Sequence, residues 1–228
     1  MIERGINPPQ KDSINSLVEL RRAFRRTHNN RQPLNDDTID KTLELPLLGD
    51  DQEQGGKDGE GFITVNGREE FIVYQGTPYN LIREGINWVK PTSSDVVYDL
   101  GCGYGRVCLY GALTTRAKWK GIDVVKSRLS AARRTKKRLN IPNVEFIQGN
   151  VVDQDLSDGT IFYLFNPFNA DTQAEVVNKL KEIAEKKPIR ILSYWTWYSE
   201  TDHNNIPSWL RLINQSRQNY YFMQLASK

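Results

Sequence analysis

The sequence predicts an α/β fold: a doubly wound, seven-stranded and mostly parallel sheet with helices on both faces. From residue 96 onward, short runs of β-branched and aromatic residues alternate with segments of helical periodicity, which is typical of parallel βαβ units. One run, Val96–Leu100, ends in a glycine-rich turn that leads into a helix. At 228 residues the chain is long enough for one such domain and an N-terminal helical extension.

The composition excludes several classes of protein. No apolar run approaches the roughly 18 residues that a membrane span needs, and the first residues lack the apolar region of a signal peptide. We therefore expect a cytoplasmic protein without a membrane partner. The only two cysteines, Cys102 and Cys108, suit a reducing compartment. His28 and His203 are too far apart in sequence to favour a metal site.

Residues 1–60 are predicted to form an extension to a domain of residues 61–228. A helix is expected over Ser13–Thr27, with Ser13 as N-cap. Its apolar positions are Ile14, Leu17, Val18 and Phe24. Four arginines crowd its C-terminal half, so it is either a basic arm for nucleic acid or an acidic partner, or an appended helix with its arginines in water; we favour the second. Residues 49–61 are rich in glycine and are expected to form a mobile loop.

Two signals precede the main sheet. Two strand-like runs in Phe62–Tyr74 flank an Asn-Gly pair, which predicts a β-hairpin. Thr77 can cap a helix with Pro78 in its first turn, so Tyr79–Val89 is predicted to be helical.

The remaining segments complete a predicted sheet of seven strands, with helices between the first five. The strands are expected at 96–100, 119–124, 144–148, 160–165, 189–195, 209–213 and 220–226, the last two as an antiparallel pair. Helices are expected at 105–115, 126–140 and 172–186. The helix at 126–140 carries seven Lys or Arg residues and no acid, a face that either binds an anionic substrate or nucleic acid or is simply solvated.

The glycine turn after the first of these strands carries the clearest functional signal. Gly101, Gly103 and Gly105 permit positive φ angles and let a ligand lie against the main chain. The G-x-G-x-x-G fingerprint of dinucleotide sites needs glycine where Arg106 stands, and no Gly-Lys-Ser/Thr follows as in a phosphate-binding P-loop. Neither nucleotide motif therefore fits this turn.

The pattern Asp-x-Gly-x-Gly-x-Gly, which starts at Asp99, resembles the first motif of the class I S-adenosylmethionine (SAM) dependent methyltransferases. The resemblance covers about residues 75–228. It implies a seven-stranded sheet with an antiparallel last strand, SAM as the cofactor, and a glycine turn that passes under the methionine part of SAM. On this basis Asp99, Gly101, Gly103 and Gly105 are predicted to bind the cofactor.

Further predicted cofactor contacts lie at the ends of the next strands. Asp123 ends the second strand, where a carboxylate can accept both ribose hydroxyls, and Val124 follows as an apolar wall for adenine. In the family, the residue at the position of Asn150 hydrogen-bonds the adenine amino group, helped by the next backbone amide, here that of Val151. Aspartate is usual there, so Asn150 is a departure, although its amide oxygen can accept the same hydrogen bond.

The Thr77-Pro78-Tyr79 segment resembles the mouth of the cofactor site in several small seven-strand methyltransferases, including protein-lysine methylating ones. In those relatives the segment helps to close over the cofactor, which makes Thr77 and Tyr79 predicted cofactor contacts. The other interpretation is a capped helix start without any ligand contact.

The fourth strand ends in Asn166-Pro167-Phe168-Asn169, which resembles the Asn-Pro-Pro-Tyr motif of amino-group methyltransferases with its last two residues replaced. We predict that Asn166, Pro167 and Phe168 form the catalytic site together with Tyr194, from the aromatic end of the fifth strand. Two plainer interpretations stay open. Asn-Pro is a common way to leave a strand, and the aromatic residues at 194–198 can pack beneath a substrate loop.

The sequence therefore predicts a SAM-dependent methyltransferase that acts on an amine, with a protein side chain as the favoured acceptor. RNA, bound through the basic helices, and a small metabolite are alternative acceptors. A SAM-binding adaptor without turnover is a further hypothesis, because Asn150 and the Asn-Pro-Phe sequence depart from the usual patterns.

Overall fold

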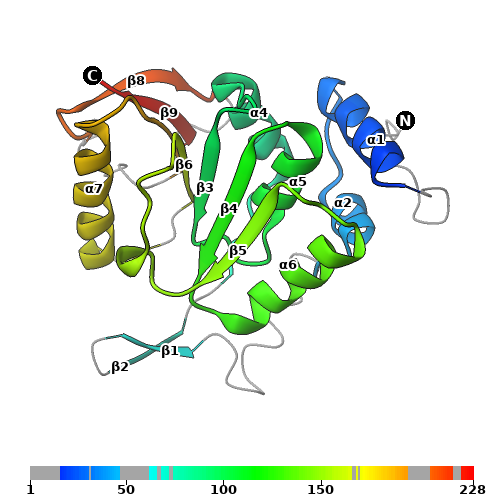
Figure 1. The fold of residues 1–228 in the computed structure, drawn as a ribbon, viewed down its shortest axis with the longest axis horizontal. Helices are drawn as coiled ribbons and strands as arrows, with labels where there is room; N and C mark the ends of the chain where they lie inside the picture. Colours follow the sequence, from blue (N-terminus) through cyan, green and yellow to red (C-terminus); the bar gives the residue numbers. More distant parts are fainter. Residues whose placement is uncertain are drawn as a thin grey trace.

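The computed structural model describes residues 16–30, 32–46, 62–65, 68–71, 74–165, 168, 170–194, 206–217 and 222–228. They form a central seven-stranded sheet flanked by helices, and a separate two-stranded hairpin (Figure 1). Strands and helices alternate along much of the chain, so the predicted α/β fold class is confirmed.

The main sheet has the strand order β5-β4-β3-β6-β7-β9-β8. Its strands are β3 (Val96–Leu100), β4 (Lys118–Asp123), β5 (Val144–Gln148), β6 (Ile161–Phe165), β7 (Arg190–Tyr194), β8 (Leu210–Gln215) and β9 (Phe222–Ser227). Neighbours pair in parallel from β5 to β7, whereas β9 is antiparallel to β7 and β8, as predicted for the last strand. The strand order reverses beside β3, and open α/β sheets bind ligands beyond the carboxyl ends of the strands at such a point.

Helices cover both faces of this sheet. One face packs against α4 (Tyr79–Val89), α5 (Arg106–Thr114) and α6 (Lys126–Arg138). The other packs against α7 (Ala170–Ala184) and the short 3-10 helix η2 (Val151–Asp153), and Figure 1 shows α7 across the sheet from α5 and α6. Each face buries its own hydrophobic cluster, with Trp119 in the first and Leu164 in the second.

The expectation of a helix between all of the first five strands is wrong at one crossover. Residues 149–160, between β5 and β6, contain only η2. Asn150 caps η2 by accepting a hydrogen bond from the Val152 amide at 3.3 Å, and the Gly159 amide closes a turn on the Leu156 carbonyl at 3.0 Å. The stretch is rich in Asn, Asp, Ser and Gly, whose local hydrogen bonds and flexibility favour turns over a helix.

The N-terminal extension contains two helices, α1 (Leu17–Asn29) and α2 (Asp36–Leu43). Helix α1 packs against α5, and α2 against α6, beside which Figure 1 shows them. Both contribute to the same hydrophobic cluster as α4 and α5, so the extension shares the core of the domain. The domain boundary at residue 60 stays a prediction.

Helix α1 differs in detail from the prediction. Its N-cap is Ser16, whose hydroxyl accepts a hydrogen bond from the Glu19 amide at 3.3 Å, and Ser13 lies outside the described residues. Leu20 and Phe24 are buried on its inner face, whereas Val18, which we placed on the apolar stripe, is 59% exposed. Leu17, Leu20 and Phe24 recur at three- and four-residue spacing and face the core, and Val18 lies off that stripe.

A hairpin precedes the main sheet, as predicted. β1 (Phe62–Val65) pairs antiparallel with β2 (Arg68–Phe71). The Asn-Gly turn between these strands and the glycine-rich stretch at 49–61 lie outside the described residues.

The start of α4 shows how the extension meets the domain. Pro78, not Thr77, occupies the N-cap position, and it offers no capping side chain. Instead a carboxylate oxygen of Asp36, on α2, accepts a hydrogen bond from the Tyr79 amide at 3.1 Å. The predicted Thr77 cap is therefore wrong, because a second helix supplies the capping acceptor.

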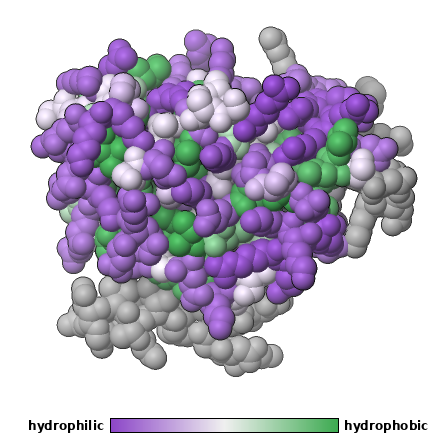
Figure 2. All heavy atoms as spheres, viewed as in Figure 1, coloured by the Kyte–Doolittle hydropathy of each residue, from purple (hydrophilic) through white to green (hydrophobic). Residues whose placement is uncertain are grey.

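The surface is mostly polar. On the face shown in Figure 2, hydrophilic residues predominate and hydrophobic ones lie in separate groups. Exposed large hydrophobic side chains include Val18, Leu212 and Ile213. Within the described part of the chain, no helix combines the length and apolar character needed to cross a bilayer.

Candidate functional site

The glycine turn lies at the switch point, between the end of β3 and the start of α5. Its first glycine, Gly101, is exposed and has a φ of 86°, a region that side chains disfavour. The amides of Gly101 and Cys102 both donate to the Ile122 carbonyl at 2.9 Å, which anchors the turn to β4. The turn is therefore anchored, and at Gly101 it presents accessible main chain where a cofactor is predicted.

The other two glycines of the turn are enclosed by side chains. A Cβ at Gly103 would overlap the ring of Tyr74, which covers this part of the turn. A Cβ at Gly105 would lie 2.6 Å from the Phe146 ring, so the start of α5 packs closely on β5. Packing thus accounts for both glycines, and their contact with a cofactor stays a prediction.

Asp123 ties the end of β4 to the glycine turn. Its side chain is 8% exposed, and its two oxygens accept hydrogen bonds from the Gly103 amide at 2.7 Å and the Val125 amide at 2.8 Å. Burial raises the pKa of Asp123, although these backbone hydrogen bonds act in the opposite direction. Each carboxylate oxygen has a second lone pair, so the predicted ribose contact remains compatible with the geometry.

Asp99, at the end of β3, is buried with little to stabilise its charge. The Cys108 sulfur lies 3.9 Å from its carboxylate. Burial, and next the charge of Asp123, raise the pKa of Asp99 to about 8. Its register neighbour on β6 is Tyr163, whose buried hydroxyl interacts with the Thr77 side chain but makes no well-formed hydrogen bond among the described residues. Buried polar groups normally have partners, so this pair is suited to receive a polar part of a ligand.

The predicted adenine contacts lie at neighbouring strand ends. Asn150 is exposed beyond the end of β5, and its side-chain oxygen caps η2, while Val151 is buried. Val124 is half-buried directly after Asp123. The structure thus brings Asp123, Val124 and Asn150 to adjacent strand ends; their adenosine contacts stay predictions.

Thr77 and Tyr79 are enclosed by protein groups. Tyr79 is fully buried, and its hydroxyl donates to Asp40 at 2.8 Å. The Thr77 carbonyl accepts a hydrogen bond from Arg106 at 3.1 Å. These contacts favour the interpretation in which Thr77 and Tyr79 fix the start of α4 within the protein. The direct contact of both side chains with the cofactor stays a prediction.

The predicted acceptor residues separate in the structure. Asn166 and Pro167 lie outside the described residues. Tyr194 stacks on Phe165, its register partner on β6, with ring centroids 4.2 Å apart and an interplanar angle of 7°. Both rings pack against the cluster on the α4 and α5 face, whereas Phe168 packs against the cluster on the α7 face.

Sequence reasoning placed Tyr74 at the edge of the site but missed other residues of this region, namely Asp36, Asp40, Tyr163 and Phe165. Signals for some of them were present. Asn35 before two aspartates is a helix start, and its side chain accepts from the Thr38 amide at 2.8 Å. Phe165 and Tyr194 end neighbouring parallel strands, so their alignment at one sheet edge was predictable.

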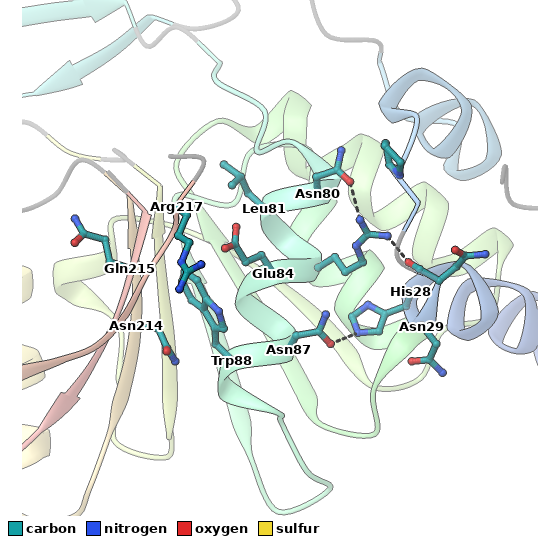
Figure 3. Close-up of a pocket in the computed structure, with 13 residues that line it drawn as sticks. His28, Asn29, Asn80, Leu81, Glu84, Asn87, Trp88, Asn214, Gln215 and Arg217 are labelled. Carbon is teal, nitrogen blue, oxygen red and sulfur yellow. Dashed lines mark hydrogen bonds between the residues drawn. The ribbon is translucent and has the colours of Figure 1, made fainter. Parts of the chain in front are cut away.

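A separate groove of about 850 Å³ lies on the outer side of α4 (Figure 3). In it, Arg83 donates to the carbonyls of Asn30 and Gln32, and a ring nitrogen of His28 lies 3.0 Å from the Asn87 side-chain oxygen. Burial lowers the pKa of His28. These contacts hold the segment between α1 and α2 on α4, and none of the predicted site residues lines the groove. In the described ranges, no three His, Cys, Asp or Glu side chains gather as a metal site requires.

Comparison with known proteins finds similarity to methyltransferases in the central part of the chain. Residues 91–189 match a family described as a methyltransferase domain. A putative RNA methyltransferase of Acanthamoeba polyphaga mimivirus is 29% identical over 131 residues, which are 53% of this chain and 32% of that protein. A protein-lysine N-methyltransferase of Saccharolobus islandicus is 26% identical over 125 residues, 54% of this chain and 76% of that protein. The matched stretch thus spans about a third of the viral relative's length.

Solved structures share the fold. A putative methyltransferase from Escherichia coli has a TM-score of 0.52 at 15% identity, over 71% of this chain and 92% of that chain. At this identity the likeness concerns the fold alone.

Proposed function

We propose that the chain is a class I SAM-dependent methyltransferase that methylates an amine, with a protein side chain as the acceptor; residues 91–189 match a family described as a methyltransferase domain. The observation that carries the proposal is the stacked pair of Phe165 and Tyr194 at the carboxyl edge of the sheet. Phe165 directly precedes Asn166-Pro167 in sequence, and both rings share a sheet face with the cluster that lies behind the glycine turn.

Three features of the chain fit SAM. Gly101 exposes main chain, and Asp123 keeps lone pairs for the ribose hydroxyls. We assign Asp99 and Tyr163 to the ammonium end of the cofactor, since a cation supplies the buried carboxyl with the partner that it lacks. When bound, SAM supplies the electrophilic methyl carbon.

The residues of the chain then align and desolvate the acceptor. Aromatic faces attract ammonium groups, and enclosure by rings lowers the pKa of an amine, which favours its neutral, nucleophilic form. Bound SAM would supply the methyl group, the acceptor nitrogen would attack it with its lone pair as the sulfur keeps the electrons of the broken bond, and the proton of the methylated nitrogen would leave to solvent. Holding the nitrogen in line with the methyl carbon and excluding water are therefore the main tasks of Phe165 and Tyr194.

The relatives support different acceptors. The Saccharolobus islandicus protein is named for lysine methylation and is matched over most of its length, which supports a protein acceptor. The viral relative is named for RNA.

The basic helix α6 bears on the choice between these acceptors. Arg128 is buried over the Tyr74 ring, Arg133 donates to the Phe146 carbonyl, and Arg138 pairs with Glu44 at 2.8 Å. Three of the seven cations thus hold the protein together, which weakens the interpretation of α6 as an RNA-binding face.

Methyl transfer from labelled SAM to fractionated cell lysate tests the proposal. We expect label in a protease-sensitive fraction that nuclease leaves intact. Label in a nuclease-sensitive fraction would establish RNA as the acceptor instead. SAM binding by calorimetry without label in any fraction would favour the adaptor hypothesis.

A further inference from the structure

Helix α2 brings two acidic side chains to the start of the domain. Asp36 and Asp40 are four residues apart, so they lie on the same face of the helix. Asp40 is fully buried, and the Asp36 side chain is 21% exposed. This helix precedes the matched methyltransferase residues and was not expected to contribute to the site.

Asp40 holds Arg106, the first residue of α5 and the neighbour of Gly105. The Arg106 Nε donates to one oxygen of Asp40 at 2.9 Å, and its Nη2 donates to the other, which makes the pair bidentate. The remaining Nη1 donates to the Thr77 carbonyl at 3.1 Å and lies 3.7 Å from Asp36. The Arg106 side chain is 3% exposed, so its charge depends on these partners.

The same two acids hold the start of α4. Asp40 accepts from the Tyr79 hydroxyl at 2.8 Å, Asp36 accepts from the Tyr79 amide at 3.1 Å, and the Arg106 guanidinium lies 4.7 Å from the centre of the Tyr79 ring. Helix α2 therefore connects the start of α4 with the start of α5, which directly follows the glycine turn. A buried polar network of this kind fixes geometry when all its members are paired.

We propose that the N-terminal extension is a working part of the cofactor site, with Asp40 as a positioning residue that acts through Arg106 and Tyr79. Removing its charge leaves Arg106 buried without its bidentate partner, so the start of α5 and the turn at Thr77 shift. Gly101 and Gly103 lie within five residues of Arg106 in the same turn, and such a shift therefore displaces the main chain on which SAM is placed. The inference rests on the proposed function, since it concerns SAM binding.

A matched control exists at the opposite edge of the sheet. Asp95 precedes β3, is 7% exposed, and accepts hydrogen bonds from Arg190 at 2.5 Å and from the Thr160 hydroxyl at 2.8 Å. It is also a buried aspartate with an arginine partner, but it lies at the amino ends of the strands. Asp95→Asn therefore reports what the loss of such a pair does to stability alone.

The experiment measures SAM affinity by calorimetry and the midpoint of urea unfolding on full-length wild-type, Asp40→Asn and Asp95→Asn proteins. We expect both variants to unfold at lower urea. Asp40→Asn is expected to weaken SAM binding about tenfold or more, because small displacements of a site are costly, while Asp95→Asn stays within about twofold. Should Asp40→Asn not fold, Tyr79→Phe removes only the hydroxyl that Asp40 accepts, with an expected loss of about threefold.

The possible outcomes separate the positioning role of Asp40 from the proposed function. Equal SAM affinities of Asp40→Asn and wild-type protein, or equal losses in both Asp variants, overturn the positioning role and leave the proposed function intact. Absence of SAM binding by the wild-type protein overturns the proposed function and this inference with it. A double variant, Asp40→Asn with Arg106→Gln, is expected to bind SAM no worse than the weaker single variant, because both changes break the same contact.

Discussion

The two edges of the sheet use similar residues in different ways. At the amino edge, Asp95 pairs with Arg190 and threonine hydroxyls. Burial alone would raise the pKa of Asp95, but hydrogen bonds from Thr92 and Thr160, together with Arg190, hold the pKa below its ordinary value. Both charges of this pair have partners, so the pair ties the strand starts together.

The carboxyl edge also has a buried aspartate with an arginine, Asp40 with Arg106, but it leaves other polar groups unsatisfied. Burial raises the pKa of Asp99 to about 8, with Asp123 adding to the effect. The Tyr163 hydroxyl beside it makes no well-formed hydrogen bond among the described residues. The two aspartates thus differ: Asp95 completes its hydrogen bonds within the protein, whereas Asp99 keeps hydrogen-bonding capacity for a ligand.

The largest expected contrast between the edges concerns Asp123. Asp123→Ala is expected to weaken SAM binding about a hundredfold, because two charge-assisted hydrogen bonds are lost. Calorimetric titration measures the effect, with Asp95→Asn as the counterpart at the amino edge. An unchanged SAM affinity for Asp123→Ala would remove this residue from the site.

A smaller effect is expected for the aromatic pair. Tyr194→Ala is expected to lower kcat about tenfold on a protein acceptor while SAM affinity changes less than about twofold, because the ring orders the acceptor. Trp209→Ala is the control, since Trp209 packs against the cluster on the α7 face. Equal rates for wild-type and Tyr194→Ala proteins would contradict an acceptor site at this pair.

The opposite pKa shifts of Asp99 and Asp95 predict opposite pH dependences of stability. The folded pKa of Asp99, about 8, lies above the unfolded value near 3.9. Its contribution to stability is complete below the unfolded value and is lost as pH rises through the folded one. The lowered pKa of Asp95 gives stability that is present above the unfolded pKa and lost as pH falls.

Urea unfolding across the pH range checks these signs. Asp99→Asn is expected to flatten the decline of the free energy of unfolding between about pH 4 and 8. Asp95→Asn is expected to flatten the decline on the acid side instead. The same slope in wild-type and Asp99→Asn proteins would show that Asp99 is ionised in the folded protein.

The smallest effect is expected for the solvated part of α6. Arg134→Ser combined with Lys137→Ser is expected to change SAM affinity and the methylation rate of a protein acceptor less than about twofold, because both side chains are exposed. A large loss of methylation in this variant that shrinks as salt is added would instead show that these cations bind an anionic acceptor.

Local patterns predicted the elements that hold the site. The run at Val96–Leu100, its glycine turn and the acid at Asp123 were recognisable because strand alternation, turn chemistry and strand ends are encoded by neighbouring residues. The structure places all three at the switch point of the sheet. The α/β class and the antiparallel last strand followed from the same signals.

Other features depended on residues far apart in the sequence. The cap of α4 was assigned to Thr77, but the acceptor comes from Asp36, 43 positions earlier. Asp40 and Arg106 are 66 positions apart, and no local pattern pairs them. The alignment of Phe165 with Tyr194 was predictable from the strand ends, but no local pattern shows that the two rings stack.

The sequence by itself determined most of the strands and helices through their periodicity, and the resemblance of one short turn to a known family indicated the cofactor class. Only the tertiary structure decided which distant groups lie around that turn and pair with it. Burial and distant partners set the charge of Asp99, the pairing of Arg106 and the stacking of Tyr194, because hydrogen bonding and desolvation depend on what lies near in space. In this chain, Asp36 and Asp40 of α2 are among the groups that lie near the glycine turn and its flanking helix starts.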